Sequence, residues 1–278
     1  MESFLINKTI GLKPNSLLAK LLPNHYQYSE HSIRIVSRNQ INYELDISDF
    51  VDFSVYSGLI NVGFKKVITF CEKGNNICDI GSNIGFTLLN FAKVVGEKGF
   101  VYGFEPDAIS YKKCQRNINI NDFQNISLNN YGLGDKHHNV TLETIENKNR
   151  GMNKIINQSR FGNNFQRIKI KTMDHFIKSH IISKIHLIKI DVEGFEFNVL
   201  KGATKTIKEM MPIIFIEIDD RLLRFQGTRP KEIIRFLKGF GYSFYDAELR
   251  NSIDSHYDFK DCHIDIICIP DSKKIFYL

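Results

Sequence analysis

DIGSNIG, residues 79–85, joins a short apolar strand predicted at 76–81 to a mostly apolar helix predicted at 84–96. Gly81 allows the backbone to turn tightly off the strand, and Gly85 allows a close approach at the start of the helix. The free N–H groups of that helix start favour a carboxylate, while Asp79 can accept hydrogen bonds from an ammonium group or from loop amides. The stretch therefore predicts a ligand that carries both an amine and a carboxylate.

The spacing of the glycines disfavours a dinucleotide. A GxGxxG fingerprint starting at Gly81 needs glycines at 83 and 86, where Asn83 and Phe86 stand, and a pyrophosphate requires bare backbone there. Glu105 ends the next predicted strand, 20 residues beyond Gly85, and an acid at this place accepts hydrogen bonds from both ribose hydroxyls. Pro106 rigidifies the turn that follows it. Together these residues predict a nucleoside site without phosphates.

The chain on either side of this stretch alternates strands with helices, which indicates βαβ units and a parallel sheet. Strands are predicted at residues 76–81, 99–106, 125–135, 186–194, 212–219, 242–247 and 262–270. Helices are predicted at residues 84–96, 108–121, 195–210 and 230–241.

Two segments depart from this alternation. Residues 136–166 are polar and rich in Asn, with one strand-like piece at 139–145, and 167–177 reads as a strand running into a short helix. Residues 1–70 form a lead-in of helix, hairpin (33–47) and helix, and we expect the main domain to span residues 71–278. We expect acceptor specificity to reside in the lead-in and in the Asn-rich segment.

Three further motifs place polar groups at predicted strand ends. In GLGD (132–135), Leu133 can pack on a base and Asp135 can take its amino group. Asp191 and Glu193 leave the fourth parallel strand, where ligands of such sheets bind, and either is a candidate general base. The alternatives are that Glu193 forms a salt bridge and Asp191 caps the next helix. Glu217 lies inside an apolar strand, so it is either a site residue or a partner of Lys189.

Composition excludes several classes of function. The net charge is +6 with no dense Lys/Arg run, so nucleic acid is not specifically indicated. The five cysteines have no CxxC spacing, and the nine histidines lack metal-ligand spacing, so we predict no metal and a reducing, cytoplasmic location. We find neither a GxSxG elbow nor a P-loop, and we expect neither a signal peptide nor a membrane span.

At this point the chain resembles the FkbM-type methyltransferases. The resemblance rests on CDIGSNIGF, GFVYGFEPD, GLGD, TMDHF, IKIDVEGFEFNVLKGA and PIIFIEI, in order from about residue 70 to 245. Ser82 departs from the family, which usually has Ala there. The resemblance implies a Rossmann-like class I methyltransferase fold, with a seven-stranded, mostly parallel sheet whose last strand is antiparallel and helices on both faces. It also implies S-adenosylmethionine as the methyl donor and O-methylation as the reaction.

The resemblance carries the cofactor residues over to this chain, and the motif analysis adds several more. The predicted cofactor residues are Asp79, Gly81, Ser82, Asn83, Gly85, Phe86, Glu105, Pro106, Leu133, Asp135 and Asp191. The predicted general base is Asp191, Glu193 or Glu217, or a histidine such as His186. We expect positioning of the acceptor oxygen to supply most of the rate enhancement. The predicted acceptor is a hydroxyl of a sugar, glycan or natural product. The alternatives are a nucleic-acid or protein methyltransferase, a non-catalytic nucleoside-binding module, and, disfavoured by Asn83 and Phe86, an NAD-linked oxidoreductase.

Overall fold

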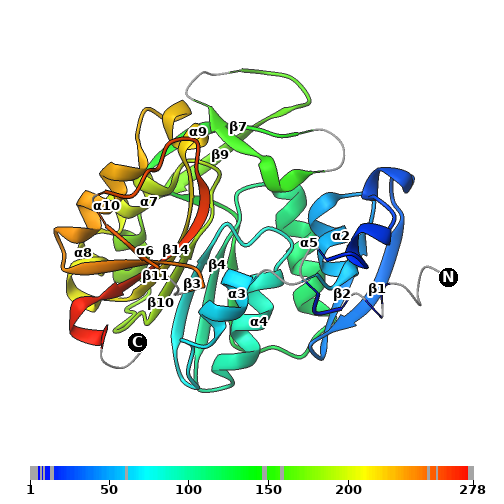
Figure 1. Ribbon diagram of the computed structural model, residues 1–278, viewed down its shortest axis with the longest axis horizontal. Helices are drawn as coiled ribbons and strands as arrows, with labels where there is room; N and C mark the ends of the chain where they lie inside the picture. Colours follow the sequence, from blue (N-terminus) through cyan, green and yellow to red (C-terminus); the bar gives the residue numbers. More distant parts are fainter. Residues whose placement is uncertain are drawn as a thin grey trace.

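The computed structural model shows an α/β fold in which a large mixed sheet carries helices on both faces (Figure 1). The residues that it describes are 6, 8, 10–12, 16–59, 62–145, 149–156, 160–248, 251–254 and 256–274. None of the helices in these ranges is long and apolar enough to cross a membrane.

The large sheet has eight strands in the order β13-β12-β14-β11-β10-β3-β4-β5. Their bounds are β3 Asn76–Ile80, β4 Phe100–Phe104, β5 Ile126–Asn129, β10 Leu187–Ile190, β11 Ile213–Asp219, β12 Tyr242–Asp246, β13 Ser252–Ile253 and β14 His263–Pro270. The strands from β5 to β11 are parallel, whereas β14 runs antiparallel between β11 and β12, as expected for the last strand. The predicted count of seven is wrong, because the two-residue strand β13 pairs with the outer edge of β12.

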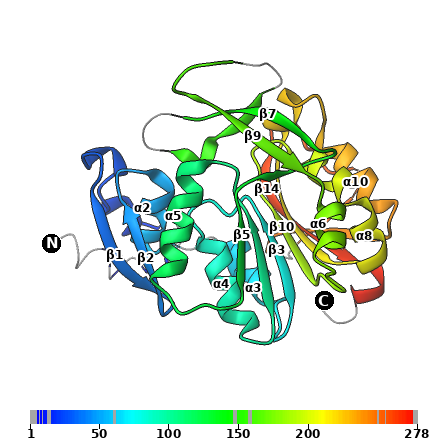
Figure 2. The same cartoon turned by 180° about the vertical axis from the view of Figure 1, so that it is seen from behind.

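Helices cover both faces of this sheet because its buried strands are apolar on both sides. Their bounds are α4 Phe86–Val95, α5 Ala108–Asn119, α6 Met173–Ser179, α7 Glu196–Gly202, α8 Thr204–Met210, α9 Asp220–Phe225 and α10 Pro230–Lys238. Ile77 packs in the core beneath α4, and the next residue, Cys78, packs in the core beneath α6, α7, α8 and α10. Figure 2 shows α4 and α8 on opposite sides of the sheet.

The helix predicted at 195–210 is two helices, α7 and α8, which meet at Ala203. Asp174 of α6 accepts hydrogen bonds from the backbone N–H groups of Lys205 (3.0 Å) and Thr206 (2.8 Å). A side chain from another helix therefore caps the start of α8. This tertiary contact is the physical reason why the predicted single helix is divided.

A second, four-stranded sheet lies beyond the carboxyl ends of the parallel strands, at the top of Figure 1. It has the order β6-β9-β7-β8, with bounds β6 Gly132–Leu133, β7 His138–Glu143, β8 Lys154–Ile156 and β9 Phe165–Lys171. Leu142, Ile155, Ile168 and Ile170 pack on Phe195 at the start of α7. The strand-like piece predicted at 139–145 thus belongs to this sheet and not to the large one.

The N-terminal segment contains the predicted hairpin, β1 Ile33–Arg38 and β2 Ile41–Asp46. Asn39 and Gln40 both have positive φ (54° and 59°), as a tight two-residue hairpin turn requires. Two short helical turns, Ala19–Leu21 and His25–Gln27, precede the hairpin, and α2 Phe50–Ser57 and α3 Val62–Ile68 follow it. The buried face of β2 packs on Ile84 and Leu89 of the main body. The boundary at residue 70 remains a prediction.

Candidate functional site

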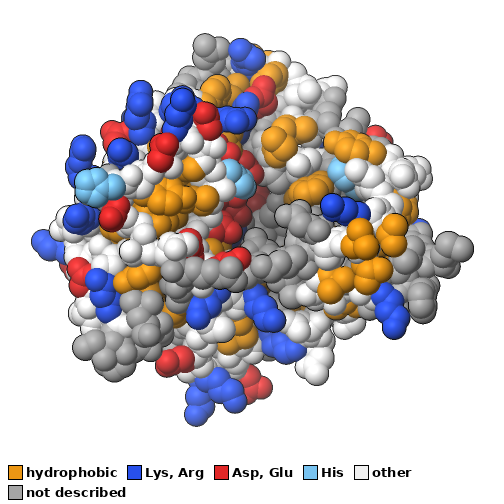
Figure 3. All heavy atoms as spheres, viewed as in Figure 1, with side chains coloured by type: hydrophobic (Ala, Val, Ile, Leu, Met, Phe, Trp, Pro, Cys, Tyr) orange, Lys and Arg blue, Asp and Glu red, His pale blue; other side chains and the backbone are white. Residues whose placement is uncertain are grey.

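A cavity of about 880 Å³ opens between the carboxyl ends of the parallel strands and the N-terminal segment. Figure 3 shows a hollow at this place with acidic side chains on its floor. Eight of the predicted cofactor residues line the cavity: Gly81, Ser82, Asn83, Phe86, Glu105, Pro106, Leu133 and Asp191. This volume lies toward the upper end of the roughly 300–1,000 Å³ typical of small-molecule pockets, so it has room for a donor and an acceptor.

The loop after β3 turns as the two glycines predict. Gly81 has φ +82° and Gly85 has φ +91°, a region that glycine occupies without strain. The N–H groups of Gly81 and Ser82 both donate to the carbonyl oxygen of Phe104, at 3.0 and 3.1 Å, which fixes the loop to β4. Gly85 forms the N-cap of α4 and does not line the cavity.

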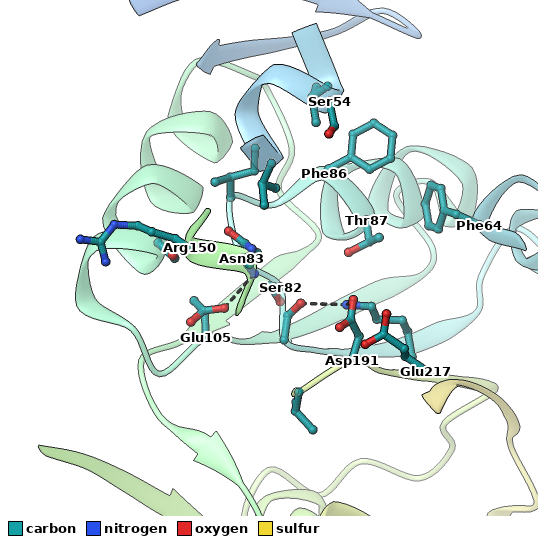
Figure 4. Close-up of a pocket in the computed structure, with 18 of the residues that line it drawn as sticks. Ser54, Phe64, Ser82, Asn83, Phe86, Thr87, Glu105, Arg150, Asp191 and Glu217 are labelled. Carbon is teal, nitrogen blue, oxygen red and sulfur yellow. Dashed lines mark hydrogen bonds and ion pairs between the residues drawn. The ribbon is translucent and has the colours of Figure 1, made fainter. Parts of the chain in front are cut away.

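Glu105 is 7% exposed and lies on the cavity wall. One of its carboxylate oxygens accepts a hydrogen bond from the N–H of Asn83 and the other from that of Asp107, each at 2.8 Å. Burial raises the pKa of Glu105 to about 7, although the two backbone donors oppose the shift. Figure 4 shows Glu105 and Asn83 joined at one side of the site, with Asp191 and Glu217 at the other.

Asp79 is completely buried and is not itself a wall of the cavity. Thr87 Oγ1 donates to its Oδ2 at 2.7 Å, and the ammonium of Lys189 lies 3.6 Å from its Oδ1. Burial raises the pKa of Asp79, while Lys189 lowers it. The ammonium group expected beside Asp79 is therefore supplied here by the protein, and Asp79 acts on the cavity through Lys189 and Thr87.

Asp191, Glu193 and Glu217 form an acidic cluster on the floor of the cavity, with one oxygen from each within 4.8 Å of the others. Lys189 contacts only Asp191 of the three, at 3.1 Å, so the alternative pairing of Glu217 with Lys189 is not found among the described ion pairs. Burial and then Asp191 raise the pKa of Glu193 to about 8 and that of Glu217 to about 10. The cluster carries more carboxyl groups than its single lysine balances, which favours a cationic ligand. Oxygens at this spacing also suit a divalent cation, so the absence of a metal remains a prediction.

His263, at the start of β14, is a cavity residue that the sequence analysis missed. Its Nε2 lies 3.5 Å from Glu217 Oε1, and its Nδ1 lies 3.1 Å from Asp219 Oδ2. The antiparallel direction of β14 brings its first residue to the carboxyl ends of the parallel strands. No local motif around His263 predicts that position.

Two predicted site residues lie elsewhere. Asp135 is exposed and outside the cavity, because the N–H of Gly134 donates to the carbonyl of Lys171 (2.9 Å) and continues the β6–β9 pairing away from the site. His186 precedes β10 at the amino ends of the parallel strands, away from the cavity. Its Nδ1 accepts a hydrogen bond there from the N–H of Asn76 at 2.9 Å. His186 is therefore too remote to serve as the general base.

The helix-capping role weighed for Asp191 is not found among the described residues, because α7 has Phe195 at its N-cap and no side-chain cap hydrogen bond. Glu196 instead fixes the turn that precedes this helix. Its Oε1 accepts hydrogen bonds from the N–H groups of Val192 (3.2 Å) and Gly194 (3.0 Å). Glu193 adopts a positive φ of 53°, an uncommon backbone conformation for a side chain with a Cβ. This turn holds Asp191 and Glu193 at the cavity floor.

Both segments expected to carry specificity contribute to the cavity wall. The N-terminal segment contributes Val51 and Ser54 of α2, and the Asn-rich segment contributes residues 149–153. The N–H of Arg150 donates to Asp49 at 3.1 Å, and its guanidinium lies 3.3 Å from Asp107. Arg150 therefore ties the two segments to the wall that bears Glu105.

Residues 79–244 match the model of the methyltransferase FkbM domain. Hexuronic acid methyltransferase AglP of Haloferax volcanii is 27% identical over 173 residues, which cover 62% of this chain and 65% of AglP. Methyltransferase 1 of Beauveria bassiana is 24% identical over 199 residues, covering 61% of this chain and 79% of that protein. Among solved structures, methyltransferase FkbM from Methylobacillus flagellatus KT is 20% identical with a TM-score of 0.47, and the match covers 72% of this chain and 44% of that one.

Proposed function

The chain belongs to the FkbM methyltransferase family, and we propose that it transfers the methyl group of S-adenosylmethionine to a hydroxyl oxygen of a sugar, glycan or natural product. The observation that carries this proposal is the convergence of three features on one cavity. These features are the Gly81–Asn83 loop, the buried carboxylate of Glu105 and the acidic cluster.

The residues present fit this donor, which supplies a methyl group already activated as a sulfonium cation. Glu105 would accept hydrogen bonds from the ribose hydroxyls, and Leu133 would pack beside the adenine. The first turn of α4 would receive the donor's carboxylate. Asp191, at the floor, would face the positively charged end, where a carboxylate is favoured over a neutral side chain.

The protein's own part in the transfer is to orient the acceptor and remove its proton. The acceptor oxygen must lie in line with the bond that breaks, and the cavity wall holds it there. One carboxylate of Asp191, Glu193 and Glu217 takes the hydroxyl proton as the new C–O bond forms. Because the positive charge beside the cluster disappears in the same step, the carboxyl that receives the proton becomes easier to protonate.

A sugar hydroxyl is the acceptor that the relatives favour. AglP is named for hexuronic acid, and the match with this chain extends over 65% of AglP. Nucleic acid is a weaker candidate, because the Lys and Arg residues form no dense run along the chain. A protein that binds the donor without turning it over is the remaining alternative.

The direct test is formation of S-adenosylhomocysteine by the purified protein with S-adenosylmethionine and a panel of hexoses, hexuronates, RNA and protein. We expect turnover with at least one sugar, and a decrease of about 100-fold in kcat for Glu217→Gln or Asp191→Asn with the Kd of S-adenosylhomocysteine little changed. Exposed Glu209 in α8 provides the control variant Glu209→Gln, which should keep full activity. Assays with EDTA show whether a metal takes part. Donor binding without turnover on any acceptor would contradict the proposal.

Binding of the donor should release protons near neutral pH. In the free protein, burial raises the pKa of Glu193 to about 8 and that of Glu217 to about 10, so both are largely protonated at pH 7. A sulfonium cation favours their charged forms, so its affinity should rise with pH, by up to roughly tenfold per unit between pH 6 and 8. S-Adenosylhomocysteine lacks that charge and should show a smaller slope.

Calorimetric titrations at several pH values, in buffers of different ionisation enthalpy, measure this proton release directly. Glu193→Gln should reduce the number of protons released on binding S-adenosylmethionine. Equal pH slopes for S-adenosylmethionine and S-adenosylhomocysteine would show that the acidic cluster does not face the sulfonium.

A further inference from the structure

The carboxylates and the unpaired cations that line the cavity come from different elements. Phe86 and Thr87 line it at the first turn of this helix, Asn90 in the middle, and Lys93 at the last turn. Among the carboxylates on the wall, Glu105 follows β4, Asp191 and Glu193 follow β10, and Glu217 lies within β11. Lys189 and Arg150 also line the cavity, and each is paired with a carboxylate. The other lining cations, Arg38, Lys65 and Lys93, lie on β1, α3 and the last turn of α4. Figure 3 shows acidic side chains on the floor of the hollow and basic ones below it, over α3 and α4.

These three cations have no carboxylate partner within ion-pair distance in the part of the chain that the structure describes. Arg38 donates to the backbone carbonyls of Ser37 (2.9 Å) and Tyr56, and its Nε is enclosed without an acceptor. Lys93 donates to the carbonyl of Asn39 and to the side-chain oxygen of Gln40 (3.0 Å). Partial burial lowers the pKa of Arg38, while Tyr56 opposes the shift.

The carboxylate of the methyl donor is not expected to bind to Arg38, Lys65 and Lys93. That carboxylate is expected at the first turn of α4, near Phe86. Lys93 follows Phe86 by seven residues, which is about 10 Å along a helix. Lys93 therefore lies too far along α4 to bind that carboxylate.

We propose that the acceptor is anionic, with a carboxylate or phosphate group bound by Arg38, Lys65 and Lys93 while its reacting hydroxyl faces the acidic cluster. This inference rests on the methyl transfer proposed above. A guanidinium and two ammonium groups are the usual partners of both anions, because their hydrogen bonds are charge-assisted. The opposite charges at the two ends of the cavity also fix the direction in which the acceptor enters. Uronic acids and sugar phosphates both supply this chemistry.

The test is calorimetric titration of the full chain, saturated with S-adenosylhomocysteine, with glucuronate, glucose 6-phosphate and glucose as probes. We expect at least one anionic sugar to bind at least about tenfold more tightly than glucose, because the cations contribute only to the charged probes. The difference between glucuronate and glucose 6-phosphate identifies which anion is preferred.

Lys65 and Lys93 are both exposed, so replacing them leaves the buried core intact. Lys93→Gln also removes the hydrogen bonds to Asn39 and Gln40. The double variant Lys65→Gln, Lys93→Gln should lose at least about fivefold in affinity for the anionic sugar and keep its affinity for S-adenosylhomocysteine. Lys208→Gln, on the exposed face of α8 and outside the cavity, is the matched control and should change neither. Arg38→Gln should add to the loss, although it also removes contacts to the N-terminal segment.

Three results would overturn the proposal. The first is equal affinity for glucose and the anionic sugars, including no binding of any probe at about 10 mM. The second is unchanged anion binding in the double variant, or the same loss in Lys208→Gln. The third is a loss of affinity for S-adenosylhomocysteine, which would assign the lysines to the donor. Failure of the proposed methyl transfer looks different, because the wild-type protein would then form no S-adenosylhomocysteine from S-adenosylmethionine with any acceptor, whereas binding of the anionic sugars is measured without turnover.

Discussion

Replacing Gly81 with alanine is expected to destabilise the protein by about 3–5 kcal/mol and to abolish binding of S-adenosylmethionine. A Cβ built on Gly81 would lie 1.9 Å from the backbone oxygen of Asp191. The added Cβ and the carbonyl oxygen of Asp191 cannot both stay in place at that distance, so the loop after β3 must move away from the end of β10. The φ of +82° at Gly81 adds the strain of a left-handed conformation for alanine.

Gly227→Ala separates the two causes of this effect. Gly227 has a similar φ of +76°, but its added Cβ would meet no atom within 4 Å. We therefore expect Gly227→Ala to cost about 1 kcal/mol, the backbone strain alone, and to leave donor binding intact. Urea denaturation and calorimetry measure both quantities. Equal stability losses in the two variants would show that contact with Asp191 does not fix the loop.

The meeting of Gly81, Asn83 and Glu105 at one cavity could be predicted from the sequence because its signals are local. Gly81, Asn83 and Glu105 follow two consecutive parallel strands, and the carboxyl ends of such strands meet at one edge of the sheet. The hairpin at 33–47 could be predicted for the same reason, since its turn and its alternating apolar residues are adjacent in sequence.

Features that depend on pairing between distant segments could not be predicted. The sequence predicts Asp135 beside the base because GLGD follows a predicted strand. In the structure, however, Gly132 and Leu133 pair with β9, far along the chain, and this pairing carries Asp135 away. The strand β13 has only two residues, too few for an alternating pattern to indicate it. His186 lies before its strand rather than after it, so its place in the sequence already argued against the cavity.

The part of the cavity that we propose binds the acceptor is assembled from residues that have no shared motif. Arg38 comes from the end of β1, Lys93 from the last turn of α4 and His263 from the start of β14. Each of them is an ordinary polar residue in its own segment. Only the packing of the hairpin on α4 and the antiparallel insertion of β14 bring them to one cavity.

Replacing Lys189 with methionine should lower the free energy of unfolding by about 3–5 kcal/mol at pH 8, because it leaves a buried carboxylate without a cation. Lys189 is 3% exposed, and its ammonium donates to the carbonyl of Gly81 at 2.8 Å while it contacts Asp79 and Asp191. Burial alone would lower its pKa, but the two carboxylates together raise the pKa above the ordinary value for lysine. The wild-type ammonium is therefore charged at every pH at which the protein is studied.

The pH dependence of this variant distinguishes lost charge from lost packing. Without Lys189, burial holds the pKa of Asp79 above its value in the unfolded chain, so the folded variant binds more protons and loses stability as pH rises. The loss in free energy of unfolding relative to the wild type should therefore be small near pH 4 and grow toward pH 8. Adding Asp79→Asn to the variant should restore part of this free energy. Lys205→Met is the surface comparison, because Lys205 and Glu209 form an exposed pair at 3.8 Å that should contribute under about 0.5 kcal/mol. If Lys189→Met loses the same free energy of unfolding at pH 4 and at pH 8, the loss comes from packing. The ion pair between Lys189 and Asp79 would then contribute nothing measurable to stability.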